Sequence, residues 1–372
     1  MMITANNGFI EQSERYAFDN AGESLKKYIL LQKGELAYNH GASKLRPFGS
    51  CFALTTAESA RIPFVYHCFS AENQNAEFLS IELNGSEVES QLRKIVSSGA
   101  RMDGLLNISF DEYATVTVLL PDIKEQEHIA DFFRNLDHLI TLHQRKYDKL
   151  QVLKKAMLEK MFPKNGSSVP EIRFKGFTDA WEQRKLGEVV ERITRKNENL
   201  ESTLPLTISA QYGLINQNEF FDKRIASKDV SGYFLVRNGE FAYNKSTSSD
   251  APWGAIKRLD RYESGVLSTL YIVFKILDER KTSSDYIVTY YNTDLWHKGI
   301  QAIAAEGARN HGLLNVAPAD FFETNLTMPK DYAEQQQIGS FFQQLDHLIT
   351  LHQRELEKLQ NIKKSMLEKM FV

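Results

Sequence analysis

Residues 132–162 read FFRNLDHLITLHQRKYDKLQVLKKAMLEKMF, and residues 341–371 read FFQQLDHLITLHQRELEKLQNIKKSMLEKMF. The two stretches are identical at 23 of 31 aligned positions, so we interpret them as copies of one element. A mostly apolar row repeats every seven residues through the first copy: Ile129, Leu136, His143, Leu150 and Met157. The second copy keeps this spacing, and neither copy contains Pro or Gly. The pattern predicts two long helices, starting near Glu125 and Glu334, that pair as an antiparallel coiled coil.

The sequence before each helix is also repeated, although more weakly. GELAYN at residues 34–39 corresponds to GEFAYN at residues 239–244, an offset of 205 residues. A Pro-x-Gly sequence follows at the same offset, ending at Gly49 in the first half and at Gly254 in the second. The chain is therefore organised as a globular unit, a helix, a second globular unit and a second helix.

Each globular unit has the alternating patterns of a mixed fold. Residues 114–120 and 271–276 alternate with period two and are typical of strands. Residues 87–98 and 285–305 are typical of helices. We predict an α+β fold with two mixed α/β units, each followed by one long helix.

The boundaries follow from the repeat and from one exposed linker, PKNGSSVP at residues 163–170. We place the first globular unit at residues 1–119, the first helix with the linker at 120–169, the second unit at 170–327 and the second helix at 328–372. The second unit opens with a stretch that has no counterpart in the first. We expect the first unit to lack about 35 residues at its N-terminus, by comparison with residues 170–206.

Composition is that of an ordinary globular protein, with 42% hydrophobic residues, 25% charged residues and a net charge of −3. The acidic balance argues weakly against nucleic-acid binding, but a basic groove needs only local clustering. Cys51 and Cys68 lie outside any C-x-x-C motif, and no apolar run is long enough to span a membrane. We expect a cytoplasmic protein with reduced thiols.

Catalytic motifs are missing from the sequence. It contains no G-x-G loop, no Pro-Pro dipeptide, no Walker lysine, no H-E-x-x-H and no G-x-S-x-G. His138 and His143 recur as His347 and His352, but each pair lies within a heptad helix, where a polar seam position is favoured over metal binding or catalysis. We expect a chain without catalytic activity, metal or bound cofactor.

Two corresponding loops have the chemistry of DNA contact, because phosphates bind Lys, Arg, Ser and Thr, and base edges bind Asn, Arg and Lys. The candidates in the second half are Tyr243, Asn244, Lys245, Ser246, Ser248, Lys257 and Arg258. Those in the first half are Tyr38, Asn39, Lys44 and Arg46. Arg101 and Arg309, each in a Gly-Ala-Arg sequence, form a further pair. A solvated Ser-rich loop and a structural turn held by Arg are the alternatives.

The combination of motifs resembles the specificity subunit of type I restriction-modification systems. The resemblance is carried by FKGFTDAWEQRKLGE at 174–188, by LPDIKEQ at 120–126 and MPKDYAEQ at 328–335, and by the duplicated FFxxLDHLI. It implies that the globular units are target recognition domains that each read one half of a split double-stranded DNA site. It also implies that the helices dock two methyltransferase subunits.

Shared helix positions are the candidates for docking: Gln144, Arg145, Gln353 and Arg354. The resemblance further implies restriction and translocase subunits, with S-adenosylmethionine, ATP and Mg on the partners rather than on this chain. Three alternatives stay open. The first is a coiled-coil adaptor, and the second is a stand-alone methyltransferase, which the missing cofactor loop disfavours. The third is a truncated variant that occupies methyltransferase subunits without full DNA recognition.

Overall fold

The structure is a computed structural model that describes residues 1–5, 8–15, 26–96, 105–164, 166–209, 212–223, 225–249, 251–304 and 312–370. The chain divides into two compact units. Unit 1 consists of residues 1–146 and 352–372, and unit 2 of residues 147–351. Each unit therefore contains one globular part and a portion of each long helix, and each is described by itself.

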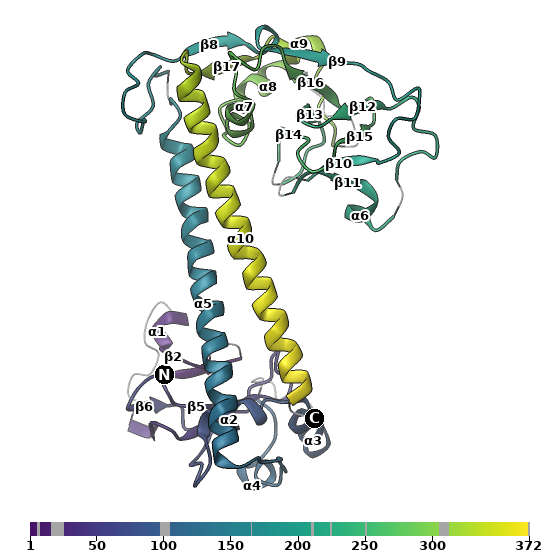
Figure 1. Cartoon of the computed structure of the whole chain (residues 1–372). Helices are drawn as coiled ribbons and strands as arrows, with labels where there is room; N and C mark the ends of the chain where they lie inside the picture. Colours follow the sequence, from purple (N-terminus) through teal and green to yellow (C-terminus); the bar gives the residue numbers. More distant parts are fainter. Residues whose placement is uncertain are drawn as a thin grey trace. The chain divides into compact units, whose positions relative to one another are not determined.

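Unit 1 is built from short strands and short helices before the first long helix (Figure 1). Its strands are β1 (Met2–Thr4), β2 (Gly8–Ile10), β3 (Ile29–Gln32), β4 (Leu36–Asn39), β5 (Ser50–Ala53), β6 (Ser59–Ile62) and β7 (His67–Phe69). Its short helices are α1 (Gln12–Arg15), α2 (Ala76–Glu82), α3 (Ser86–Ile95) and α4 (Phe110–Tyr113). The strands form antiparallel sheets of order β5-β4-β7, β3-β6 and β1-β2.

Unit 2 repeats this arrangement with additional strands. Its strands are β8 (Glu182–Lys185), β9 (Val190–Ile193), β10 (Leu206–Ser209), β11 (Gly213–Asn216), β12 (Phe234–Arg237), β13 (Phe241–Asn244), β14 (Ala255–Arg258), β15 (Ser264–Leu267), β16 (Ile272–Ile276) and β17 (Asn325–Met328). Its short helices are the 3-10 turn η2 (Leu186–Glu188), α6 (Gln217–Phe221), α7 (Ser284–Tyr290), α8 (His297–Ile303) and α9 (Pro318–Phe322). The sheets have the order β14-β13-β16-β9, β12-β15, β10-β11 and β17-β8.

The strand pairing confirms the repeat at an offset of 205 residues. Tyr38 pairs with Cys51 between β4 and β5, and Tyr243 pairs with Ile256 at the same register between β13 and β14. The backbone conformation explains why the Pro-x-Gly sequence has a glycine in both units. Gly49 and Gly254 have φ of 81° and 79°, and a Cβ atom on either would collide with the carbonyl oxygen of the strand residue opposite.

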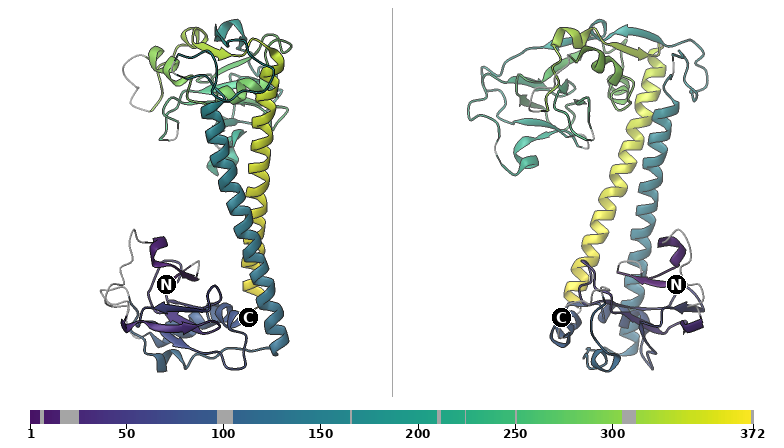
Figure 2. Two further views of the ribbon diagram at one scale, coloured as in Figure 1. Left: turned by 90° about the vertical axis from the view of Figure 1, so that its left-hand side faces the viewer. Right: turned by 180° about the vertical axis from the view of Figure 1, so that it is seen from behind.

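Both long helices form as predicted. α5 spans Ile123–Lys160 and α10 spans Tyr332–Met370, with Asp122 and Asp331 accepting backbone hydrogen bonds in the first turns. In unit 1, the portions of α5 and α10 lie side by side and antiparallel (Figures 1 and 2): Asp137 pairs with Lys363, and His143 meets His352 farther along. In unit 2, Lys154 pairs with Asp346.

Two predicted elements differ from the structure. The stretch 285–305 is two helices, α7 and α8, because the chain turns at Tyr291 and Thr293 Oγ1 donates to the carbonyl of Tyr290. The stretch 114–120 is not a strand, whereas its counterpart β17 pairs with β8. The described part of unit 1 has no equivalent of β8, and Leu119 is 79% exposed. A strand needs a partner, so the prediction for residues 114–120 was wrong.

Candidate nucleic-acid interface

In unit 2, the polar turn after β13 is tied to a second segment of the chain. Thr247 donates from its backbone N and from Oγ1 to the carbonyl oxygen of Gly312, at 2.8 and 2.9 Å. The backbone N of Leu314 donates to the carbonyl of Lys245, and Ser246 and Leu313 form an isolated antiparallel β-bridge. Two loops that are far apart in sequence therefore meet at one place.

Unit 1 has the same arrangement after β4. Gly41 and Leu105 form an isolated antiparallel β-bridge, and the backbone N of Leu106 donates to the carbonyl of His40 at 2.9 Å. The segments beginning at Leu105 and Gly312 start four and three residues after the arginines of the two Gly-Ala-Arg sequences. Arg101 and Arg309 themselves lie outside the described residues, so their predicted role stays a prediction.

Tyr38 and Tyr243 are corrections to the predicted interface. Each is buried, with 1% and 0% exposure, and burial raises the pKa of both phenols. Their hydroxyls donate to the carbonyls of Phe48 (2.6 Å) and Trp253 (2.8 Å), which closes the two corresponding hairpins. These tyrosines support the turns from inside the core and do not face DNA.

Asn39 and Asn244 hold the turns themselves. Asn39 Oδ1 accepts from the backbone N of Gly41 at 2.9 Å, and Asn244 Oδ1 accepts from that of Ser246 at 3.0 Å. These are Asx turns, which use the amide oxygen that a base contact would need. Both asparagines therefore stabilise the turns, and their contact with DNA stays a prediction.

Two of the predicted cations of unit 2, Arg258 and Lys257, are bound to groups within that unit. Arg258 pairs with Asp260 and Asp285, at 2.6 and 2.8 Å. Lys257 Nζ donates to Asn292 Oδ1 at 2.9 Å, and burial lowers the pKa of its ammonium. We therefore remove Arg258 and Lys257 from the interface.

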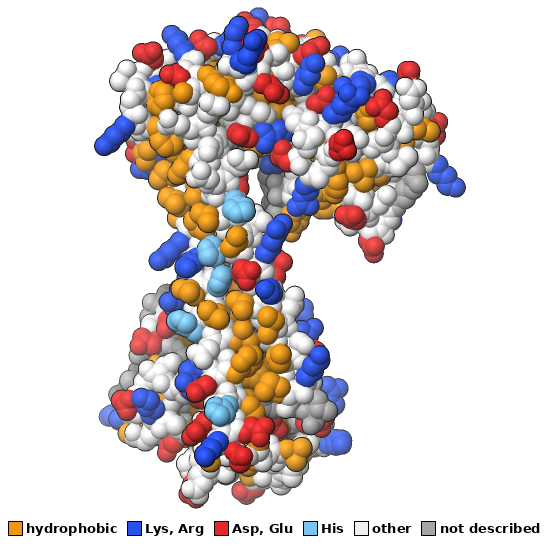
Figure 3. Space-filling model, viewed as in Figure 1, with side chains coloured by type: hydrophobic (Ala, Val, Ile, Leu, Met, Phe, Trp, Pro, Cys, Tyr) orange, Lys and Arg blue, Asp and Glu red, His pale blue; other side chains and the backbone are white. Residues whose placement is uncertain are grey.

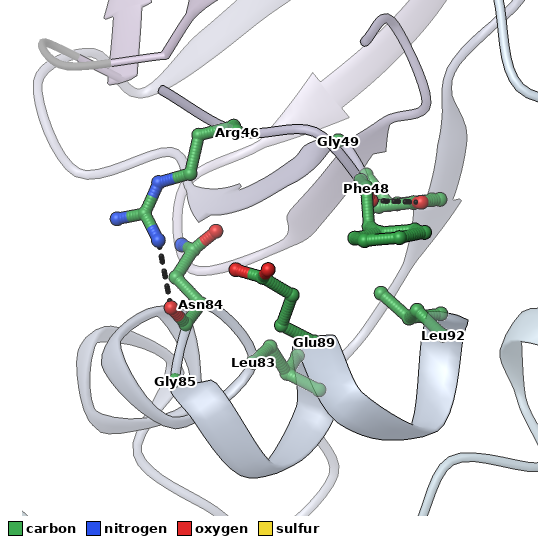
Figure 4. Close-up of a pocket in the computed structure, with 9 residues that line it drawn as sticks. Arg46, Phe48, Gly49, Leu83, Asn84, Gly85, Glu89 and Leu92 are labelled. Carbon is green, nitrogen blue, oxygen red and sulfur yellow. Dashed lines mark hydrogen bonds between the residues drawn. The ribbon is translucent and has the colours of Figure 1, made fainter. Parts of the chain in front are cut away.

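Arg46 borders a small cavity of unit 1 (Figure 4). Its Nη1 donates to the carbonyl of Asn84 at 2.7 Å, and burial lowers the pKa of the guanidinium. The cavity measures about 10 Å³ between the turn that carries Gly49 and the start of α3. That is room for about one water molecule, so the cavity is too small to be a ligand site. Arg46 instead stabilises the turn through its hydrogen bond to Asn84.

The remaining candidates are accessible. Lys44, Ser246 and Ser248 are exposed, and Lys245 is partly exposed with Nζ 3.3 Å from the carbonyl of Val316. Hydroxyl, ammonium and backbone groups on such turns can donate to phosphate oxygens. The interface predicted from sequence therefore narrows to the tips of the two turns.

Sequence reasoning missed an aromatic and basic surface on unit 2. Tyr212, in the turn of the β10–β11 hairpin, is 47% exposed, with the Arg261 guanidinium 6.0 Å from its ring centroid. Phe220 and Phe221 on α6 are also exposed. Exposed aromatic rings beside a cation suit stacking on bases. The signal available in sequence was the pair Tyr212 and Phe220 flanking a short strand.

The long helices also carry exposed apolar side chains outside the heptad row. Leu139 and Leu142 are exposed in unit 1, as are the corresponding Leu348 and Leu351 in unit 2. Figure 3 shows hydrophobic and histidine side chains at the surface along the helical part of the chain. Of the predicted docking residues, Arg145 and Arg354 are exposed, and Gln144 and Gln353 are partly exposed. Apolar surface flanked by arginine is typical of protein interfaces.

Within the described ranges, no group of three or more His, Cys, Asp or Glu side chains could hold a metal ion. In the same ranges, every helix is too short or too polar to cross a membrane.

Neither a protein-family model nor a curated protein matches the chain. A solved structure does: the S subunit of the type-I restriction-modification system from M. genitalium is 13% identical, with a TM-score of 0.55, over 93% of this chain and 85% of that chain. The chain has the fold of a type I restriction-modification S subunit.

Two other solved structures match with lower TM-scores. The HsdS subunit from Thermoanaerobacter tengcongensis is 14% identical, with a TM-score of 0.42, over 92% of this chain and 81% of that chain. A chain from a structure of type I R-M system assembly and conformational transition is 15% identical, with a TM-score of 0.43, over 92% and 82%. In the S-subunit fold shown here, a long helix follows each mixed α/β unit, as predicted from the sequence.

Proposed function

We propose that this chain is the DNA-binding specificity subunit of a type I restriction-modification complex. It reads a bipartite, asymmetric site in double-stranded DNA, one half with each globular part. Partner subunits then carry out adenine methylation and restriction at the sites that it selects. The chain itself is not an enzyme.

The observation that carries this proposal is the uneven divergence of the repeat on an S-subunit fold. The hairpins keep one register, yet the turns at their tips carry different side chains, such as Lys44 in unit 1 where unit 2 has Ser249. The helices, in contrast, are identical at 23 of 31 positions. Two different readers and two equivalent docking surfaces are what an asymmetric site and two identical partners require.

The turn tips supply the DNA contacts. Ser246, Ser248 and Lys245 serve one half-site and Lys44 the other, with Arg101 and Arg309 on the adjoining segments. Hydroxyls and ammonium groups position the protein on phosphates, whereas contacts to base edges in the major groove specify sequence. Tyr212 and Arg261 extend the surface of unit 2.

Two methyltransferase subunits dock on the helices, at the exposed leucines and at Arg145 and Arg354 with Gln144 and Gln353 beside them. S-adenosylmethionine, ATP and Mg bind to the partner subunits, because this sequence has no loop for the cofactor or nucleotide. Restriction and translocase subunits complete the assembly, which works in the cytoplasm.

Co-purification tests the proposal. The tagged chain should retain its cognate methyltransferase subunits, and the double variant Leu142→Asp/Leu351→Asp should retain far less of them. Lys223→Asp, at an exposed position outside the two long helices, is the control and should retain as much as the parent chain. Equal retention by all three chains would contradict docking on the helices.

A further inference from the structure

In unit 2, the segment that opens the second repeat is built into the core. Trp181 is 5% exposed, and its indole Nε1 donates to Glu334 Oε1 at 3.3 Å. Arg173 grips the same carboxylate, with Nε and Nη2 each 2.7 Å from one of its oxygens. Phe174 packs edge-on against Phe341, with ring centroids 6.0 Å apart. β8 then pairs with β17 over the four residues Glu182–Lys185.

Unit 1 carries the same receiving groups. Glu125 corresponds to Glu334 and Phe132 to Phe341, both at an offset of 209 residues. Residues 117–120 correspond to β17. The groups that hold the opening segment in unit 2 therefore exist twice in the chain.

In unit 1 these groups are uncovered. Phe132 is 42% exposed and Leu120 is 44% exposed, whereas Met328, the counterpart of Leu120, is 2% exposed. Glu125 is exposed, whereas Glu334 is 1% exposed. The apolar surface and the carboxylate that the opening segment covers in unit 2 both face solvent in unit 1.

The described hydrogen bonds to the backbone of residues 117–120 come from side chains of the short helices α2 and α3. Gln91 on α3 bonds both the N and the carbonyl of Thr117, at 2.9 and 2.8 Å, and Glu82 accepts from the backbone N of Leu119. In unit 2, Tyr290 and Tyr286 donate to the equivalent carbonyls of Asn325 and Thr327.

In unit 2, β8 pairs along the opposite edge of β17. Among the described residues, the backbone groups of Val118 and Leu120 have no hydrogen-bond partner in unit 1. An extended segment with one unpaired edge is a template for the addition of a further strand.

We propose that Glu125, Phe132 and residues 117–120 form a docking site that accepts a strand-and-loop segment. The segment has the chemistry of residues 171–185: an arginine for the Glu125 carboxylate, an aromatic side chain for Phe132, and an extended run that pairs with residues 117–120. Charge complementarity selects the arginine, since bidentate arginine–carboxylate pairs are among the strongest hydrogen-bonded contacts in proteins. Unit 2 shows the filled form of the site, and the inference does not depend on DNA recognition.

A peptide of residues 170–194 of this chain, carrying a fluorescent label, is the probe, and the full chain is the receptor. Fluorescence anisotropy should show saturable binding. Glu125→Lys in the chain should weaken it at least tenfold. The same peptide with Arg173→Glu should bind the Glu125→Lys chain more tightly than it binds the parent chain. Glu159→Lys, an equal change of charge at an exposed position of α5, should leave binding unchanged.

The place of binding is tested with a photoreactive benzoyl-phenylalanine at position 174 of the peptide. Cross-links should map to the stretch of α5 around Phe132. The proposal is overturned if the peptide does not bind, if Glu125→Lys and Glu159→Lys weaken binding equally, or if the cross-links map only to α10 around Phe341. The last result would mean that the peptide displaces its own copy in unit 2.

Discussion

Gln126 and Gln335 make the same hydrogen bonds at the start of the two long helices. Each is 1% exposed, and each Nε2 donates at 2.9 Å to a proline carbonyl, that of Pro121 or Pro329. Each Oε1 accepts from the backbone N of a residue that N-caps a short helix, Asn75 of α2 at 3.0 Å or Ser283 of α7 at 2.9 Å. One side chain thus joins each long helix to the globular part before it.

Replacing these glutamines should destabilise the chain. Gln335→Ala leaves a buried N–H and a buried carbonyl without a partner, at a cost of about 1–3 kcal/mol in the free energy of unfolding. Gln126→Ala should cost a similar amount, and the exposed neighbour Gln336→Ala less than about 0.5 kcal/mol. Urea denaturation gives the comparison. Equal midpoints for Gln335→Ala and Gln336→Ala would show that the buried bonds do not hold the junction.

The two equivalent glutamates should respond differently to loss of charge. Glu334→Gln leaves Arg173, which is 12% exposed, without its carboxylate and should lower the free energy of unfolding by about 3 kcal/mol. Glu125→Gln removes an exposed carboxylate and should change it by less than about 0.5 kcal/mol. Similar losses for both variants would mean that Glu125 is already covered in unit 1.

The histidine pair predicts a dependence of stability on pH. His143 Nδ1 and His352 Nδ1 are 3.1 Å apart. Desolvation, followed by the charges of His143 and Lys146, lowers the pKa of His352 from its ordinary value of 6.5. The folded chain therefore takes up this proton less readily than the unfolded chain, so stability is full above pH 6.5 and falls as the pH drops below it.

Thermal unfolding between pH 7.5 and 5 measures this dependence. The melting temperature of the parent chain should fall further over this interval than that of His352→Gln, because glutamine takes up no proton at that position. A parent and a variant with identical pH profiles would contradict the effect.

The two turn tips should make different kinds of contact with DNA. Ser246→Ala should affect only the half-site that unit 2 reads, by about 1–3 kcal/mol if its hydroxyl contacts a base. Lys44→Ala should weaken binding to every sequence and lower the salt dependence by about one charge, as loss of a phosphate contact does. Binding to duplexes altered in one half at a time, at two salt concentrations, separates these results. Unchanged affinity for both variants would favour the solvated-loop alternative.

The long helices and the repeat could be predicted because both are encoded locally. A heptad row without Pro or Gly specifies a helix wherever it lies. The offset of 205 residues appears in matched turns such as those of Gly49 and Gly254, where only glycine fits the backbone. Matching turns of this kind survive large changes in the surrounding sequence.

The candidate interface was less predictable, because the same atoms serve structure and recognition. Asn244 Oδ1 could accept from a base or from the backbone N of Ser246, and sequence does not distinguish them. The burial of Tyr38 could have been predicted from the sequence, because the period of two places Tyr38 on the same face of the strand as Leu36. The failure at residues 114–120 had a different cause, because a strand depends on a partner that lies elsewhere in the chain.

Base-resolved mapping of adenine methylation tests the central claim most directly. The chain is expressed with its cognate methyltransferase subunits in a host without other adenine methylation. The account predicts methylation at one bipartite motif with two different half-sites, and loss or relaxation of only one half-site in Ser246→Ala. Methylation without any sequence motif, or none at all from an assembled complex, would contradict the claim that this chain reads a split DNA site.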